Sequence, residues 1–188
     1  MTLLRQGLLD GRAVALAGGV PPALGDALVA LGARVEEIDV GPELDEEAAS
    51  SWAGGVLPLY ALVYDARPAF GGGGQDGLRA CLERAWVAVR GLATGALIPA
   101  GAGKVVLIAP RPDTGSFATA ARAALENLAR TLSVEWARYG LGTVAIAPGT
   151  STTDDEVAEL VCFLVSPAGE YFTGCLFELG GGELIRSS

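Results

Sequence analysis

Residues 104–149 read KVVLIAPRPDTGSFATAARAALENLARTLSVEWARYGLGTVAIAPG, and three elements follow one another in this stretch. The apolar run over 104–109 is typical of a strand buried on both faces. From Phe117 to Arg138, apolar residues recur at helical spacing, which predicts an amphipathic helix; they are Ala121, Leu125, Leu128, Leu132 and Trp136. A second apolar run, 143–147, stops at Pro148-Gly149. Strand, helix and strand in this order indicate a parallel crossover unit.

The same alternation continues on both sides of this unit. The predicted further strands are 13–17, 33–38, 59–64 and 175–179, and the predicted further helices are 22–31, 78–97 and 157–165. The acidic stretch 43–53 is expected to form a surface helix or loop, and the glycines 71–74 a flexible tip. Because no repeat or linker interrupts the pattern, residues 1–188 are predicted to form one α/β domain with a parallel sheet.

Composition narrows the classes of function. The net charge of -9 argues against a nucleic-acid partner, which needs clustered Lys and Arg. The chain has no histidine, which excludes Ser-His-Asp and Cys-His mechanisms and histidine metal sites. Cys81, Cys162 and Cys175 have no metal-ligand spacing and are interpreted as reduced thiols, which favours the cytoplasm. No apolar run is long enough for a membrane span, no signal peptide is recognised, and the excess of arginine over lysine suggests a bacterial source.

One motif favours a nucleotide site. Gly18 and Gly19 directly follow the first strand and precede a helix, and Asp39 ends the next strand. Such glycines let a pyrophosphate approach the backbone, and such a carboxylate accepts from ribose hydroxyls. However, the third glycine of a G-x-G-x-x-G motif is out of register, and Pro21 and Pro22 remove two N–H donors. A glycine-rich turn with no ligand is therefore an equal alternative.

The whole chain resembles the short-chain dehydrogenase/reductase family. LLDGRAVALAGG resembles the opening strand and glycine loop, LGARVEEID the second strand with its acidic cofactor residue, and ALVYDA the Asn-Asn-Ala-Gly segment, of which Ala66 remains. GKVVLIAP resembles the strand that ends in the catalytic serine, residues 120–149 the catalytic helix and Pro-Gly strand, and VAELVCFLVSPAGEYFTGCLFELGGG the ending. The resemblance implies a three-layer, Rossmann-like, doubly wound parallel sheet with helices on both faces. It implies NAD or NADP as cofactor, held by Gly18, Gly19, Asp39 and Ala66.

The residues that the family's chemistry requires are replaced. The tyrosine and lysine of the catalytic helix correspond to Ala118 and Arg122, the serine to Ala109 or Pro110, and the supporting asparagine falls near Trp86. We therefore predict no catalytic and no metal-binding residues. Ser116, Thr119 and Tyr139 carry other hydroxyls, but Tyr139 lies about six turns further along the same helix. Thr114 and Ser116 are candidates to line the pocket, and a position in a surface loop is the favoured interpretation of both. Arg122, Glu126 and Arg130 are expected to form an i, i+4 ladder on the helix surface.

The chain is also shorter than the resemblance implies. There is no room between Asp39 and Leu59 for the usual extra helix and strand, and only residues 150–155 stand where the family has its long substrate loop. The expected sheet therefore has about six strands in the order 2-1-3-4-5-6. The helices 78–97 and 117–138 and the last strand, through which the family assembles, are kept.

Three functions are compatible with this pattern. The first is a non-catalytic structural partner subunit, in a homo- or hetero-oligomer with a complete reductase. The second is a nucleotide-binding sensor module. The third is an active NAD(P)-dependent oxidoreductase with an atypical proton donor.

Overall fold

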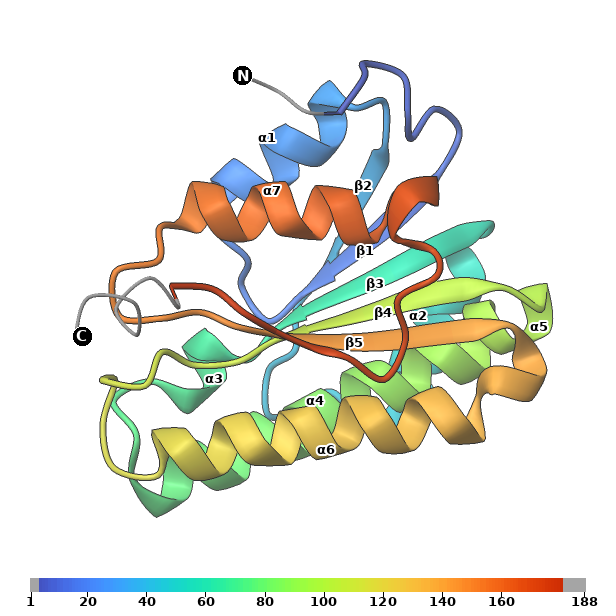
Figure 1. Ribbon diagram of the computed structural model, residues 1–188. Coiled ribbons are helices and arrows are strands. Elements are labelled where there is room, and N and C mark those ends of the chain that lie inside the picture. The colour runs from blue at the N-terminus through green and yellow to red at the C-terminus, as the bar shows by residue number, and fades with distance from the viewer. Residues whose placement is uncertain (1–3, 181–188) are drawn as a thin grey trace.

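A six-stranded parallel sheet forms the centre of the molecule in the computed structural model, which describes residues 4–180 (Figure 1). The strands lie in the order β2-β1-β3-β4-β5-β6, which confirms the predicted order. Their bounds are Ala13–Ala17 for β1, Arg34–Ile38 for β2, Leu59–Asp65 for β3, Gly103–Ile108 for β4, Leu141–Ala147 for β5 and Leu176–Glu178 for β6. Every neighbouring pair is parallel, so all carboxyl ends lie at one edge of the sheet.

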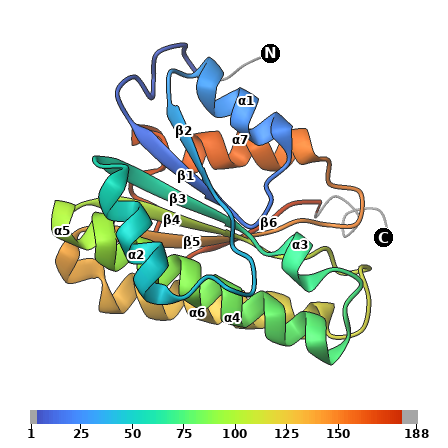
Figure 2. The ribbon, with the colours of Figure 1, turned by 180° about the vertical axis from the view of Figure 1, so that it is seen from behind.

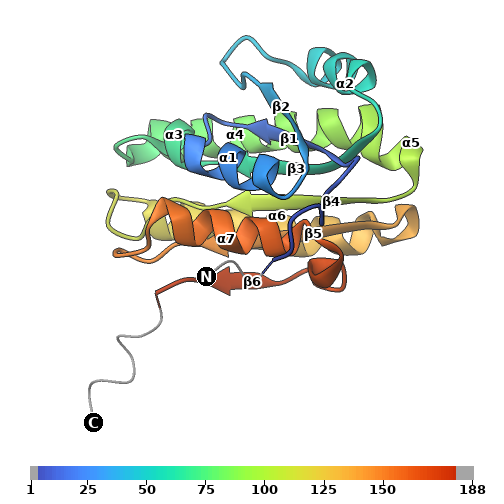
Figure 3. The ribbon, with the colours of Figure 1, turned by 90° about the horizontal axis from the view of Figure 1, so that it is seen from above.

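Helices cover both faces of the sheet, as predicted. One face carries α1 (Pro22–Ala30) and α7 (Asp154–Leu164), and the other carries α2 (Glu46–Gly55), α4 (Gly74–Leu92) and α6 (Ala118–Glu135) (Figures 1 and 2). Shorter pieces are α3 (Arg67–Phe70), the π-helical η1 (Ala93–Leu97), α5 (Ile98–Ala100) and the 3-10 turns η2 (Ala137–Tyr139) and η3 (Pro167–Gly169). Viewed along the layers, β2 and β6 form the two edges of the sheet (Figure 3). The apolar core is accordingly split into one cluster on each face.

Three predicted helices have different bounds in the structure. The helix expected at 78–97 begins earlier, at Gly74 of the expected flexible tip, and gives way to the π-helical turn η1 after Leu92. The helix expected at 117–138 ends at Glu135, and η2 follows it. The helix expected at 157–165 begins at Asp154, because Thr153 and Glu156 form a reciprocal capping box around its first turn.

The prediction of a surface helix or loop at 43–53 is confirmed as a helix, and one side of that helix is buried. The segment forms α2, in which Ala49 and Ala53 are fully buried against α4. A Cβ atom on Gly91 would lie 2.5 Å from the Ala49 Cβ, and one on Gly95 would lie 2.3 Å from the Ser50 carbonyl oxygen. Helix α2 therefore packs so closely against α4 and η1 that no side chain fits at Gly91 or Gly95. The acidic composition of α2 gave no sign of this contact.

Candidate functional site

The strand register brings the predicted cofactor residues to one edge of the sheet. Ala17 of β1 is paired with Ile38 of β2 and Tyr64 of β3, so the residues that follow, Gly18 and Asp39, lie at the same level as Asp65. Asp39 is exposed there. Ala66 is fully buried, and its N–H donates to the Ile108 carbonyl oxygen at 2.9 Å. The structure thus places the predicted residues at the carboxyl edge, where open α/β sheets bind ligands.

The glycine loop after β1 is constrained by the backbone that follows β3. Gly18 has a φ of +92°, and a Cβ atom there would lie 2.2 Å from the Asp65 carbonyl oxygen. Glycine is therefore required by the neighbouring backbone itself. At Gly19 an added Cβ atom would lie 3.6 Å from the Pro68 ring, so α3 covers the loop. Helix α1 begins with Pro21 as its N-cap and Pro22 as its first residue, and no side chain caps it.

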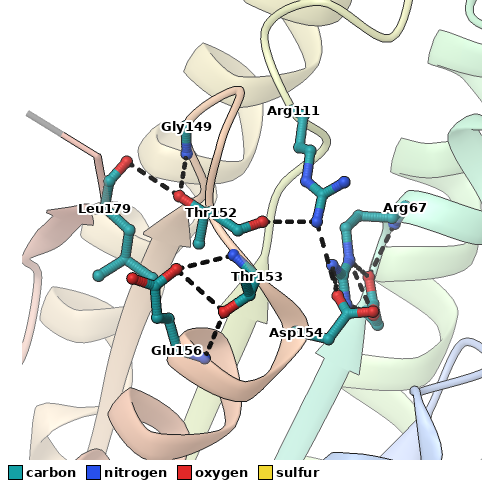
Figure 4. Close-up of polar contacts among 9 residues, drawn as sticks. Arg67, Arg111, Gly149, Thr152, Thr153, Asp154, Glu156 and Leu179 are labelled. Carbon is teal, nitrogen blue, oxygen red and sulfur yellow. Dashed lines mark hydrogen bonds and ion pairs between the residues drawn. The ribbon is translucent and has the colours of Figure 1, made fainter. Parts of the chain in front are cut away.

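An ion-pair cluster that sequence reasoning missed lies beside this loop (Figure 4). Asp65, at the end of β3, is buried, and the Arg67 guanidinium lies against it. The Nε atom of Arg67 donates to both carboxylate oxygens at 3.0 and 3.1 Å, and an Nη atom donates to Oδ2 at 2.8 Å. The other Nη atom donates to Asp154 Oδ1 at 2.6 Å. We call Asp65, Arg67 and Asp154 the clasp, because it joins the end of β3 to the first turn of α7.

Arg111, from the loop after β4, lies at the outer side of the clasp. Its Nη2 atom donates to the Thr152 carbonyl oxygen at 2.6 Å and lies 3.8 Å from Asp154 Oδ1. The Thr152 hydroxyl accepts from the Gly149 N–H at 2.8 Å and lies 3.4 Å from the Leu179 carbonyl oxygen (Figure 4). These contacts connect the loops after β3, β4 and β5 and the end of β6.

Burial dominates the electrostatics of the clasp. It raises the pKa of the Asp65 carboxyl, and the hydrogen bonds and charge of Arg67 oppose that rise. Burial alone would lower the pKa of Arg67, but its contacts with Asp65 and Asp154 outweigh this, so its pKa lies above the ordinary value. The guanidinium is therefore charged at every pH at which the protein folds. Its contacts fix the rotamer of Arg67 and hold α3 against the end of β3.

The positions that the resemblance assigns to catalysis hold no acid or base. Ala118, at the tyrosine position, is 1% exposed, and Ala109 and Pro110, at the serine position, are buried. Trp86, near the asparagine position, is 40% exposed on α4, with Arg90 stacked 5.5 Å from its ring centre.

The predicted Arg122 ladder is wrong in one member. Arg130 does pair with Glu126 at 2.6 Å. Arg122 instead turns inward, and its Nη1 atom donates to the carbonyl oxygens of Pro110 at 2.9 Å and Pro148 at 2.7 Å. These carbonyls follow β4 and β5, so the guanidinium joins two neighbouring strand ends. The i, i+4 spacing gave no sign of these long-range acceptors.

Of the hydroxyl residues considered as substitutes, Thr114 lines the cavity beside the glycine loop, next to Arg111. Ser116 and Thr119 are exposed, and the Thr114 hydroxyl donates to the Arg111 carbonyl oxygen at 2.7 Å. Tyr139 lies in η2, beyond the opposite end of α6. Among residues 4–180, no group of histidine, cysteine, aspartate and glutamate side chains is arranged to hold a metal ion. In the same range, no helix is long and apolar enough to cross a membrane.

Several known proteins with similar sequence or structure are dehydrogenases. The chain is 28% identical over 124 residues to galactitol 2-dehydrogenase (L-tagatose-forming) of Cereibacter sphaeroides, which covers 48% of this chain and 49% of that protein. Its fold matches citronellol catabolism dehydrogenase AtuB of Pseudomonas aeruginosa with a TM-score of 0.77 at 22% identity, over 95% of this chain and 97% of that one. It matches an oxidoreductase of the short-chain dehydrogenase/reductase family from Burkholderia thailandensis with a TM-score of 0.78 at 20% identity, over 92% of each chain.

The chain is similar in sequence to part of a known dehydrogenase. It has the Rossmann fold of the oxidoreductase of the short-chain dehydrogenase/reductase family described above. The sequence matches span between about a third and a half of the length of the curated relatives. No protein-family model matches the chain. The predicted family resemblance and fold class are confirmed, and the roles assigned to Gly18, Gly19, Asp39 and Ala66 stay predictions.

Proposed function

We propose that this chain is a non-catalytic homologue of the short-chain reductases that serves as a structural partner subunit of an active NAD(P)-dependent reductase. The observation that carries the proposal is the methyl group of Ala118, buried where the family's chemistry needs a proton-transferring hydroxyl. Arg122, at the position of the family's lysine, already holds two main-chain carbonyls. Neither residue supplies a proton to a substrate, because alanine has none to give and arginine keeps its proton.

The outer side of α6 supports a role in assembly. Eight residues of α6 are exposed, and only Arg130 and Glu135 of these are charged; the other six are Thr119, Ala120, Ala123, Asn127, Thr131 and Val134. Val134 is 78% exposed, and Trp86 on α4 is a second large exposed apolar residue of the same helical layer. A surface of this kind allows another helix to approach closely with little side-chain entropy lost. The partner surface is accordingly α4 and α6, extended by α7 and the β6 edge.

Light scattering coupled to size-exclusion chromatography tests the partner role. The protein alone, and mixed with any co-encoded reductase, is expected to form a dimer or larger oligomer. Ala123→Arg places a long charged side chain at the centre of the α6 surface and should dissociate the assembly. Asp26→Arg, at an exposed position on α1 of the opposite face, is the matched control and should leave it intact. A strict monomer in both preparations contradicts the proposal.

Nicotinamide absorbance tests the absence of chemistry. Purified protein with NADH or NADPH and a panel of ketones, or with NAD+ or NADP+ and a panel of alcohols, is expected to give a flat trace. Hydride transfer that disappears in Arg122→Ala would instead favour an active oxidoreductase with atypical residues.

A further inference from the structure

We infer that the clasp prevents nicotinamide dinucleotides from binding in the cleft at the carboxyl edge of this sheet. We also infer that the clasp fixes the loops after β3 and β5, as a bound ligand would otherwise do. This inference goes beyond the partner role proposed above and does not depend on it. It is based on the observation that the residues of the cleft do not suit the cofactor that the family resemblance implies.

The cavity beside the glycine loop is small for a dinucleotide. Between the glycine loop, α3 and the loop after β4 lies a cavity of about 260 Å³, lined among others by Gly19, Asp65, Arg67, Arg111 and Asp154. Sites for small organic ligands commonly measure roughly 300–1,000 Å³, and a dinucleotide is long for its class. The Arg67 side chain crosses this space from Asp65 to Asp154, and Pro68 stands over Gly19. Asp39 and Ala66 do not line the cavity.

Several donors of the cleft are already in use, although the buried Nε of Arg111 has no hydrogen-bond partner among residues 4–180. Pro21 and Pro22 carry no N–H at the start of α1, where an anion would otherwise meet main-chain donors. The Arg67 guanidinium already donates to Asp65 and Asp154 with all three of its nitrogens. The Nη2 of Arg111 donates to the Thr152 carbonyl.

The charges of the cleft lead to the same conclusion. Two carboxylates and two guanidinium groups line it, and their formal charges cancel. A doubly charged pyrophosphate would have to separate Arg67 from a buried carboxylate and then lie beside that carboxylate. The clasp therefore opposes the ligand twice, by occupying the arginine and by repelling the phosphates.

Titration of the wild-type protein tests this inference directly. NADH and NADPH are followed by fluorescence, and NAD+ and NADP+ by calorimetry, each up to about 5 mM, with an active short-chain reductase as positive control. We expect no saturable signal and no change in Tm. A ligand with a Kd of about 50 μM would raise Tm by roughly 5–11 °C at 5 mM. Saturable one-to-one binding that weakens in Asp39→Ala would overturn the inference.

The loop-holding role is tested by removing the clasp. Arg67→Met leaves Asp65 buried without its partner and should lower Tm by about 6–20 °C. Arg34→Met is the matched control, because Arg34 is 53% exposed, pairs with Glu36 at the free edge of β2 and donates to the Val56 carbonyl oxygen at 2.9 Å. Because these contacts are exposed, the substitution should change Tm by less than about 4 °C. Equal Tm values for the two variants would overturn the inference. If Arg67→Met does not fold while the control does, the loss of stability exceeds the expected range and supports the role of the clasp in holding the loops. The ligand titration is independent of this result, because it uses only the wild-type protein. Because oligomeric state is measured separately, failure here leaves the partner role standing.

Discussion

Arg122→Met separates a structural from a catalytic role for the residue at the family's lysine position. In the structure its Nη1 atom donates to the carbonyl oxygens of Pro110 and Pro148. A hydrogen bond from a charged donor contributes about 1.5–3 kcal/mol. Because the side chain is partly exposed, we take the lower part of that range for each bond. Methionine keeps most of the apolar stem, so the expected loss in the free energy of unfolding is about 3 kcal/mol, or roughly 6–12 °C in Tm.

The assay is urea unfolding followed by tryptophan fluorescence, with the m-value required to stay constant. Arg130→Met is the matched control, since Arg130 lies on the same helix, is 62% exposed and only pairs with Glu126. It should cost about 0.5 kcal/mol or less. If the two variants have the same midpoint, the two carbonyl contacts of Arg122 do not stabilise the fold and the structural interpretation fails.

Three further predictions follow from individual side chains. Burial lowers the pKa of Lys104 from its ordinary value of 10.5 to about 8. Between pH 8 and 10.5 the unfolded chain therefore binds more protons than the folded protein, so the contribution of Lys104 to the free energy of unfolding rises with pH in this range. Wild type should therefore gain about 1–3 kcal/mol relative to Lys104→Met between pH 7 and 10 in urea titrations, and a constant difference would refute this. Phe117 has a φ of +71°, so Phe117→Gly should be more stable than Phe117→Ala by about 1 kcal/mol, the reverse of their order within a helix, as thermal melts can show. Burial raises the pKa of Cys81 and of Cys162 to about 11, so a thiol reagent should modify Cys175 first and reach all three cysteines only after unfolding; three equally fast thiols in the native protein would contradict the placement of the two buried ones.

The sequence predicted the elements that have a regular period. Unbroken apolar runs such as Leu59–Tyr64 and the helical spacing of Ala121, Leu125 and Leu132 depend only on local pattern, and the structure buries all of these residues except Tyr60, which is half-buried. Strand order followed from the family resemblance and the missing segment between Asp39 and Leu59. The surroundings of α2 were not predictable in this way, because its contact with α4 depends on glycines about 45 residues away in the sequence.

The site was predicted less completely than the fold, because its contacts cross the chain. Arg67 and Asp154 are separated by 87 positions, and neither belongs to a motif that joins them. One local signal did exist: an arginine stands where the family's Asn-Asn-Ala-Gly segment ends in glycine, two residues after an aspartate. An arginine at a position where the family has glycine indicates that its side chain occupies the space next to the end of the strand. The alternating charges of Arg122, Glu126 and Arg130 were misleading, because they are compatible both with a surface ladder and with the inward contacts that Arg122 makes.

The carboxyl edge of a parallel sheet collects helix N-termini and loop donors, and these favour anions. A cleft kept for an anionic ligand leaves some of those donors unpaired until the ligand arrives, since donors already used inside the protein add nothing to binding. Here the carboxylate of Asp154, in the first turn of α7, takes the place of such an anion and is held by Arg67. The Asp65 carboxylate balances the same guanidinium from the other side. The edge thus satisfies its own charges, and the same argument that explains the stability of these loops without a ligand explains why a dinucleotide should not bind there.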